Sequence, residues 1–193
     1  MSSIIRCSWC ESSNLMRNYH DKEWGTPQHK DKIIFEYILL DTFQAGLSWS
    51  TILNKRENFK KAFSNFDPVK ISKYTEKDYE RLMNDPGIIR NKLKIRAMIN
   101  NAKIFLELQK EFGTFDKYIW QFVDYKTIGG KRKIGGHWPS TSKESDAMSK
   151  DLKDRGFKFV GSTICYAFMQ AAGMVNDHIV SCTRYNEVQK IRK

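Results

Sequence analysis

The chain has 193 residues, and its 33 Lys and Arg residues against 22 Asp and Glu residues give a formal net charge of +11. Apolar residues make up 40% and aromatic residues 13%, which supports a packed core and excludes an intrinsically disordered chain. No apolar run reaches the roughly 18 residues of a membrane helix, and the first residues lack an apolar signal segment. We therefore expect a cytoplasmic protein with reduced cysteines and no membrane partner. The positive charge favours a polyanionic partner, nucleic acid first, over a merely soluble basic protein.

Helical periodicity dominates the sequence, whereas convincing strands with alternating apolar residues are absent. Ser48 and Thr75 are typical N-cap residues, and Gly113 is a typical C-terminal stop. We therefore expect an all-α fold, in one domain or in two small lobes that share a core. The predicted helices are residues 32–45, a helix after Ser48, a helix from Pro68, a short helix from Thr75 to before Pro86, and residues 91–112, 115–123, 142–156 and 162–172.

Residues 126–137 interrupt the helical pattern with two glycine pairs and the basic run Lys131-Arg132-Lys133. This composition predicts a mobile basic loop near a phosphate backbone, and it is equally typical of a merely solvated loop.

The last two predicted helices are separated by a short turn between Gly156 and Gly161. Free backbone amides at the start of the second helix form an anion site, and a glycine lets a phosphate approach closely. Together with the positive charge, this spacing fits a DNA-binding helix–hairpin–helix element about as well as an ordinary helical hairpin. The candidate DNA contacts of the hairpin are Lys158, Gly161 and Thr163.

Cysteines and histidines near both ends of the chain are spaced like metal ligands. Cys7 and Cys10 form a C-x-x-C pair, and His178 and Cys182 would share one face of a helix. Such a set would make a tetrahedral structural zinc site, although unligated side chains remain an alternative. Two quartets fit the spacing: Cys7, Cys10, His178 and Cys182, or Cys7, His20, His178 and Cys182. Of the remaining cysteines and histidines, we expect Cys165 in the core. We expect His29 and His137 at the surface.

Asp41 follows Tyr37 by four residues and Ile38 by three, so it extends the apolar face of its predicted helix. A carboxylate there must pair, accept hydrogen bonds or change its pKa. Aromatic residues follow and precede it, among them Trp49 and Tyr19. A buried acid among aromatic rings suits a pocket for a cationic or polar heterocycle, whereas the simpler interpretation is an aspartate at the end of a helix.

Several long motifs together resemble the type I 3-methyladenine DNA glycosylases, a family of the helix–hairpin–helix glycosylase superfamily. The resemblance spans residues 6 to about 182, nearly the whole chain. The matching motifs are Tyr19-His-Asp-Lys-Glu-Trp-Gly25, Gln44-Ala-Gly-Leu-Ser-Trp49, Lys55-Arg-Glu-Asn58, Phe66-Asp-Pro-Val-Lys70, Gly87-Ile-Ile-Arg90, Arg155-Gly-Phe-Lys-Phe-Val-Gly161 and Asn176-Asp-His178.

The resemblance implies one glycosylase domain over residues 1–193, with two helical lobes and a hairpin element at about 145–172. It also implies that one structural zinc joins the terminal segments, about 1–25 and 173–193. The family's zinc ligands match Cys7, His20, His178 and Cys182. Cys10 lies outside this pattern, and we expect it to be a reduced bystander.

The resemblance further implies a monomeric DNA repair enzyme that flips 3-methyladenine out of double-stranded DNA and hydrolyses its N-glycosidic bond. The stacking aromatic residues match Tyr19 and Trp49, with Trp9 close by, and the DNA-inserting turn matches Gly46-Leu47. Asp41, the candidate catalytic residue, stands where the family has a glutamate that contacts the alkylated adenine. It keeps the charge and shortens the reach by one methylene.

We expect a monofunctional enzyme that leaves an intact abasic site. Strand-nicking relatives carry a lysine where this chain has Thr163, and a hydroxyl cannot form the Schiff base that strand cleavage needs. Asn176 occupies the position of the superfamily's catalytic aspartate, while Asp177 is expected to support the zinc ligands. The alternatives are a glycosylase for another lesion, a non-catalytic zinc-stapled module that binds damaged DNA, and a zinc hydrolase, which would need an open metal site.

Overall fold

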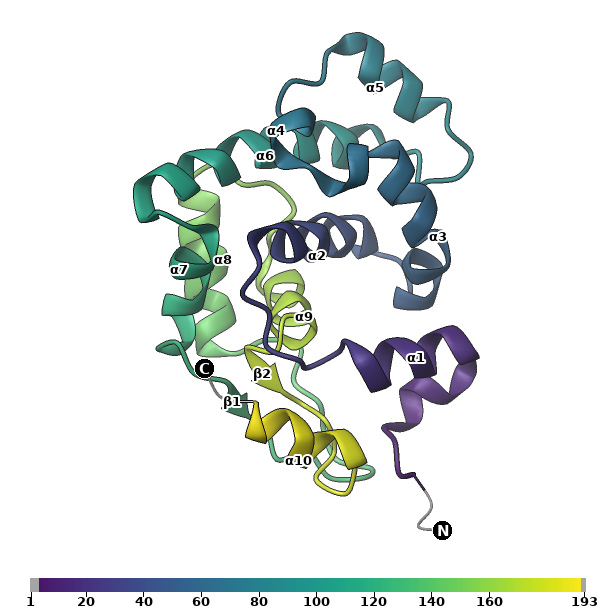
Figure 1. Ribbon diagram of the computed structural model, residues 1–193, viewed down its shortest axis with the longest axis vertical. Coiled ribbons are helices and arrows are strands. Elements are labelled where there is room, and N and C mark those ends of the chain that lie inside the picture. Colours follow the sequence, from purple (N-terminus) through teal and green to yellow (C-terminus); the bar gives the residue numbers. More distant parts are fainter. Residues whose placement is uncertain (1–3, 192–193) are drawn as a thin grey trace.

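The computed structural model describes residues 4–191 and confirms a mostly helical fold (Figure 1). Among these residues, no helix has both the length and the apolar character needed to cross a membrane. The elements, with η for 3-10 helices, are η1 (Ser8–Ser12), α1 (Asn14–Lys22), α2 (Asp31–Gln44), α3 (Trp49–Ala62), η2 (Ser64–Phe66), α4 (Pro68–Ile71), α5 (Glu76–Met83), α6 (Lys92–Phe112), α7 (Phe115–Trp120), η3 (Gln121–Val123), β1 (Ile128–Gly129), α8 (Lys143–Asp154), α9 (Ser162–Ala171), β2 (Val175–Asn176) and α10 (Thr183–Lys190).

The helix boundaries follow the capping residues of the sequence. The side chain of Ser48 accepts a hydrogen bond from the backbone N–H of Thr51 at 3.2 Å, and α3 begins at the next residue. Asn91 caps α6 in the same way, and Gly113 ends that helix with a φ of 84°. The helix predicted over residues 91–112 is therefore confirmed to within one residue.

Other boundaries differ from the prediction. The helix expected over residues 115–123 divides into α7 and η3, and α8 ends at Asp154 instead of Gly156. The helices α1 and α10 and the two short strands were not predicted. Both helices span nine residues or fewer, so neither shows a long apolar stripe in the sequence.

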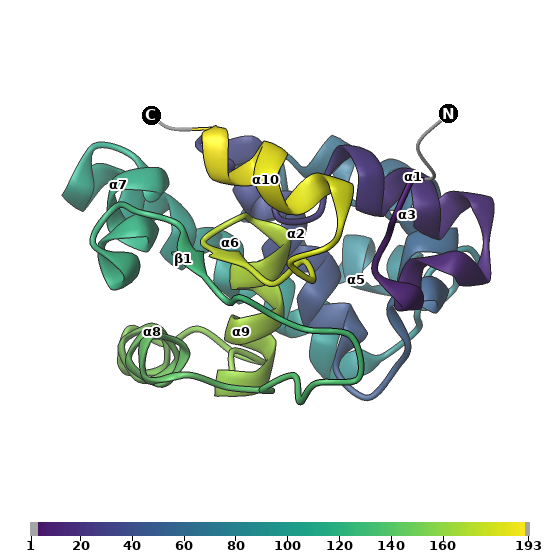
Figure 2. The ribbon, with the colours of Figure 1, turned by 90° about the horizontal axis from the view of Figure 1, so that it is seen from below.

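Buried apolar side chains form two clusters. The larger one surrounds α2, in which nine of the fourteen residues are buried, and α3, α6 and α9 pack against this helix. Figure 1 shows α2 in the middle of these helices, and Figure 2 shows α8 and α10 on opposite sides of the molecule. The smaller cluster brings the two ends of the chain together through Cys7, Met16, Tyr19, Trp24, Leu53, Ile179 and Cys182.

The two short strands anchor the basic loop at residues 126–137, which was expected to be mobile. They run parallel, with Ile128 opposite Val175, and Arg132 forms a further bridge to Ile179. Arg132 Nε also lies 2.8 Å from the buried carboxylate of Asp177. The guanidinium at the centre of the basic run therefore pairs inside the protein.

Candidate active site and metal site

Two cysteines and two histidines from opposite ends of the chain meet in the smaller cluster. Cys7 precedes η1 and His20 lies on α1, while His178 follows β2 and Cys182 caps α10. One ligand atom from each residue lies within 4.8 Å of the other three, and all four side chains are buried. Cys10 is also buried but lies outside this group. Of the two quartets that the spacing allowed, the structure assembles the one that contains His20.

Each histidine of the cluster makes a hydrogen bond through its outer ring nitrogen. His20 Nδ1 lies 2.8 Å from Asp21 Oδ1, and His178 Nε2 lies 3.0 Å from the carbonyl oxygen of Trp24. The inner nitrogens, His20 Nε2 and His178 Nδ1, lie 3.5 Å and 3.6 Å from Cys182 Sγ. Two thiols and two imidazoles held in this way fit a tetrahedral zinc ion.

The remaining histidines and cysteines lie outside the cluster. Cys165 is buried in the large core and His137 is exposed, as predicted. His29 was expected at the surface but is half-buried, because its Nδ1 lies 2.7 Å from Asp116 Oδ1 and its ring lies 4.4 Å from that of Trp120.

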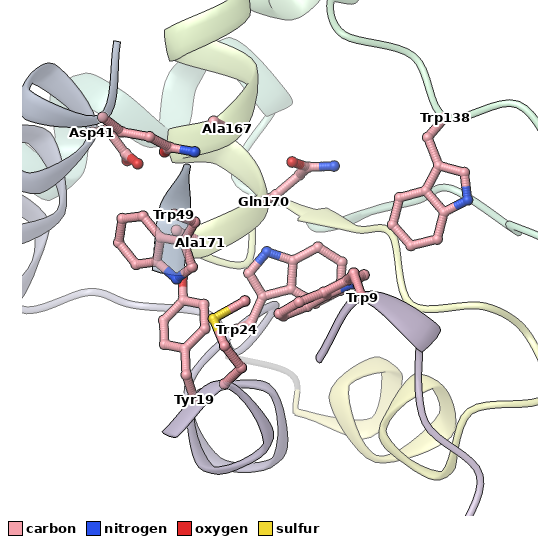
Figure 3. A pocket seen from close by; sticks show the side chains of 11 residues that line it. Trp9, Tyr19, Trp24, Asp41, Trp49, Trp138, Ala167, Gln170 and Ala171 are labelled. Carbon is pink, nitrogen blue, oxygen red and sulfur yellow. The ribbon is translucent and has the colours of Figure 1, made fainter. Parts of the chain in front are cut away.

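A cavity of about 300 Å³ lies beside the cluster, with aromatic walls (Figure 3). The rings of Tyr19 and Trp49 are 5.1 Å apart, and those of Trp9 and Trp24 are 4.9 Å apart. The cavity has the size of small-molecule sites, and it brings together the predicted acid and all three predicted stacking residues. Its lining consists of Trp9, Met16, Tyr19, Trp24, Asp41, Gln44, Trp49, Trp138, Ala167, Gln170 and Ala171.

Asp41 lies near the end of α2 and is 2% exposed. Its Oδ2 has no hydrogen-bond partner among the described residues, and the same holds for Nε1 of Trp49. Burial raises the pKa of the Asp41 carboxyl well above its usual range. Buried polar groups without hydrogen-bond partners destabilise a protein. A ligand that hydrogen-bonds to Asp41 and Trp49 would remove this cost.

Lys94 of α6 holds the end of α2 that carries Asp41. Its ammonium group donates to the carbonyl oxygens of Phe43 at 2.7 Å and Ala45 at 2.6 Å, and burial lowers the pKa of Lys94. These bonds satisfy carbonyl groups that the helix end leaves open. We missed Lys94 in the sequence; the signal is a lysine four residues before Met98, on the inward face of a predicted helix.

The turn after α2 carries the predicted DNA-inserting residues. Gly46 has a φ of 78°, and a Cβ there would meet no atom within 4 Å. Leu47 is 40% exposed, and its N–H donates to the Gln44 carbonyl oxygen at 2.6 Å. An exposed apolar side chain on a tight turn is typical of a wedge that enters a base stack. Trp49, two residues later, links this turn to the cavity.

The connection between α8 and α9 is held by two asparagines of α6 that sequence analysis did not single out. The fully buried Asn101 accepts from the Lys158 N–H at 2.9 Å and donates to the Lys158 carbonyl oxygen at 3.0 Å. Asn100 donates to the Gly156 carbonyl oxygen at 3.0 Å. The backbone of the hairpin is therefore fixed by the protein itself.

The predicted DNA contacts on the hairpin face outward. Lys158 and Thr163 are exposed. Gly161 has a φ of −61°, which any residue adopts, and a Cβ there would meet no protein atom within 4 Å. Nothing within the described protein requires a glycine at this position, which favours close approach of a partner to the N-terminal amides of α9.

Asn176 and Asp177 are completely buried and used internally. Asn176 accepts from the His178 N–H at 3.3 Å and donates to the Tyr185 carbonyl oxygen at 3.1 Å. The expectation that Asp177 supports the zinc ligands is wrong, because its carboxylate faces α9 and the anchored loop, where its partners are Arg132, Tyr166 and Gln170. The groups that hold the histidines are Asp21 and the Trp24 carbonyl.

Comparison with known proteins agrees with this geometry. The family model described as methyladenine glycosylase matches residues 9–185. DNA-3-methyladenine glycosylase 1 of Escherichia coli (strain K12) is 48% identical over 180 residues, which cover 93% of this chain and 96% of the relative. A crystal structure of 3-methyladenine DNA glycosylase I is 46% identical with a TM-score of 0.90, and the match covers 93% of this chain and 98% of that one. A variant of such an enzyme in complex with 3-methyladenine is 33% identical, with a TM-score of 0.89 and coverage of 92% and 96%.

These observations define a mostly helical protein in which a short connection joins α8 to α9 and an aromatic cavity lies beside the Cys/His cluster. Within this class, the chain belongs to the methyladenine glycosylase family.

Proposed function

We propose that this chain is a DNA-3-methyladenine glycosylase, which hydrolyses the N-glycosidic bond of 3-methyladenine in alkylated double-stranded DNA. The observation that carries the proposal is the buried, unpartnered carboxyl group of Asp41 in an aromatic cavity of a methyladenine glycosylase family member. The activity in the names of its relatives, and 3-methyladenine in a solved neighbour, support this substrate.

The charge of the alkylated base determines what the cavity must supply. Alkylation at N3 makes adenine cationic and a good leaving group, so the chain needs no strong general acid. A cation beside Asp41 favours its ionised form and gains a charge-assisted hydrogen bond. Stacking on Tyr19 and Trp49 adds about 0.5–2 kcal/mol for each favourable cation–π contact. Ordinary adenine lacks the positive charge, so it gains less binding free energy from the Asp41 carboxylate and from the aromatic rings.

The base reaches the cavity by extrusion from the duplex, which costs a few kcal/mol. Leu47 fills the space that the base leaves, and Gly46 provides the turn that presents it. Lys158, Gly161 and Thr163 bind the phosphate backbone without reading a base. One monomer carries all of these groups in a single domain, residues 1–193; the first three and last two residues of that domain lie outside the described residues.

Cys7, His20, His178 and Cys182 hold one structural zinc ion in this proposal, and the ion joins the two ends of the chain. Four protein ligands complete a tetrahedral shell, so the ion supplies folding stability and no hydrolytic water. Elemental analysis of protein purified without added metal should find one zinc per chain, and folded, active protein with a zinc content near zero would contradict the proposal.

The enzyme is monofunctional in this proposal and leaves an abasic site. No lysine occurs between Ser162 and Ala172, so this helix lacks the amine that a Schiff base requires. The side chain of Asn176 is engaged with backbone groups, which fits a reaction that needs no acid at that position. Borohydride treatment on alkylated DNA should trap no covalent adduct; an adduct would identify a lyase.

The decisive experiment is incubation with methylated duplex DNA, followed by chromatography of the released bases. We expect 3-methyladenine, while 7-methylguanine as well would show a broader lesion range. Absence of any free base, with binding retained, would favour a non-catalytic module that binds damaged DNA.

Substitution of Asp41 separates catalysis from binding. Asp41→Asn should slow single-turnover base release by about 100-fold or more, because it removes the charge that meets the cationic base, whereas DNA affinity should change less than about threefold. Asp41→Glu is the matched control, since it keeps the charge and restores the reach of the family's glutamate. Equal losses of release and binding in Asp41→Asn would assign Asp41 a structural role.

A further inference from the structure

Gln170 presents an amide group to the cavity from α9, one helical turn after Tyr166. Figure 3 shows the amide oxygen on the side of Asp41 and the amide nitrogen on the side of Trp138. The cavity therefore has polar side chains on α9 as well as on α2.

The nitrogen of this amide is fixed by a buried carboxylate outside the cavity lining. Gln170 Nε2 donates to Asp177 Oδ2 at 2.9 Å, and the same oxygen accepts from the hydroxyl of Tyr166 at 2.7 Å. Arg132 Nε donates to the other oxygen at 2.8 Å, and its Nη2 donates to the Tyr166 hydroxyl at 3.0 Å. Asp177 is completely buried, so water does not compete for these bonds.

This network decides which way the amide points. The carboxylate of Asp177 pairs with Arg132 and accepts hydrogen bonds on both oxygens, so it can hold the nitrogen of Gln170 and not the oxygen. The oxygen is then the free end of the amide. The hydrogen bond from the nitrogen to a charged acceptor also polarises the amide and strengthens its oxygen as an acceptor.

We propose that Gln170 is a specificity-determining residue, whose amide oxygen accepts a hydrogen bond from the exocyclic amino group of the extruded adenine, and that Asp177 holds this oxygen in place. The proposal rests on the glycosylase function proposed above. The amino group carries two hydrogens, so it serves two acceptors, Asp41 from α2 and Gln170 from α9.

The arrangement selects against purines that carry a carbonyl oxygen at the same position. Cationic methylated guanine would place that oxygen against two acceptors, because the cation keeps Asp41 ionised and Asp177 fixes the amide of Gln170, so neither group could donate to it. A site built to accept a hydrogen bond strongly rejects a ligand that cannot donate one. A freely rotating amide would lose this selectivity, because it could turn its nitrogen to the carbonyl group.

The test compares affinities for two free bases, 3-methyladenine and 3-methylguanine, measured by quenching of tryptophan fluorescence. Four tryptophans line the cavity, so binding there reports directly. Gln170→Met keeps the length of the side chain and removes the amide. It should weaken 3-methyladenine binding about tenfold and change 3-methylguanine binding less than twofold. Asp177→Asn should also lower the ratio of the two affinities. The new amide can donate a hydrogen bond to the Gln170 oxygen, so the Gln170 amide is no longer held in one orientation.

Gln109→Met is the matched control. Gln109 Nε2 donates to Asp31 Oδ2 at 2.6 Å, outside the cavity lining, so this variant loses a similar amide–carboxylate bond and should keep the affinity ratio. Gln170→Ala replaces Gln170→Met if the latter does not fold. If wild-type protein releases and binds 3-methyladenine but the Gln170 variants keep its affinity ratio, the inference is wrong and the proposed function stands. If wild-type protein neither releases nor binds this base, both are wrong.

Discussion

Two buried polar sites lie side by side in this protein, and they are organised in opposite ways. In the Cys/His cluster, the outer nitrogens of His20 and His178 bond to the protein, and the inner ligand atoms lie within 4.8 Å of one another. In the neighbouring cavity, Asp41 Oδ2 and Trp49 Nε1 have no partner among residues 4–191. The first set is closed on itself, whereas the second is open to a ligand.

The proposed ligands, a zinc ion and an extruded base, explain this difference by how long each one stays. A resident ion stabilises the fold, so the chain can orient every group of its site in advance. A transient base must leave, so its polar partners remain unsatisfied and destabilise the free protein. The two sites are in contact through Trp9, whose ring centroid lies 5.4 Å from that of His20 and whose side chain also lines the cavity.

The largest effect is predicted for loss of a ligand from the Cys/His cluster. Cys182→Ser should lower the melting temperature by about 10 °C or more, because loss of one ligand from a structural zinc removes several kcal/mol of folding free energy. Calorimetry together with the zinc content of the purified variant measures this effect.

Cys10→Ser is the matched control, since Cys10 is buried in the same region but lies outside the ligand group. It should retain one zinc per chain and shift the melting temperature far less. Equal effects of the two substitutions would mean that packing, and not metal binding, makes these cysteines important.

The second prediction concerns the open site and its pH dependence. The pKa of Asp41 is raised in the folded protein, so between about pH 4, the ordinary value for an aspartate, and this raised pKa the folded state binds more protons than the unfolded state. Stability contributed by this group therefore falls as pH rises through that window. Asparagine does not titrate, so the melting temperature of Asp41→Asn relative to wild type should increase from pH 4 upward.

Melting curves of both proteins between pH 4 and pH 8 measure this difference. Asp124→Asn makes the same substitution at an exposed aspartate and is the matched control for the change from carboxylate to amide. An Asp41→Asn difference that does not change with pH would mean that the carboxylate is not held in an unfavourable environment.

Much of this molecule was predictable from local sequence. Capping residues such as Ser48 set helix ends because their side chains bond to the nearest free amides, a strictly local interaction. Asp41 stood out because its position on an apolar face follows from helical spacing alone. The choice of His20 over Cys10 came from the family resemblance, since spacing allowed both.

The rest depended on contacts between distant segments. Lys94 reaches carbonyl groups 49 and 51 residues away, and Asn101 bonds a backbone 57 residues away. Arg132 was expected in a loop that faces either a phosphate backbone or solvent, but the pairing of β1 with β2 brings it to Asp177. Hydrogen bonds of this kind leave no period in the sequence, and so neither propensity nor spacing reveals them.

The third prediction concerns the connection between α8 and α9, which lies outside the Cys/His cluster and the cavity. Gly161→Ala should weaken binding to duplex DNA about tenfold, because the added methyl group projects into space that we assign to a phosphate. Since this methyl group meets no protein atom within 4 Å, the melting temperature, zinc content and affinity for free 3-methyladenine should stay close to wild type. A DNA affinity equal to that of wild type would remove Gly161 from the interface.

The smallest predicted effect is electrostatic. Each phosphate contact releases counterions, so the logarithm of DNA affinity falls with the logarithm of salt concentration in proportion to the number of contacts. Lys158→Ala should therefore reduce this slope by about one and weaken binding less than Gly161→Ala at physiological salt. Lys190→Ala removes an equal charge from α10, which lies on the opposite side of the molecule from α8 (Figure 2), and should leave the slope unchanged. Neither variant should alter the two buried sites, so equal slopes for both would mean that net charge, and not the fixed hairpin, attracts the DNA.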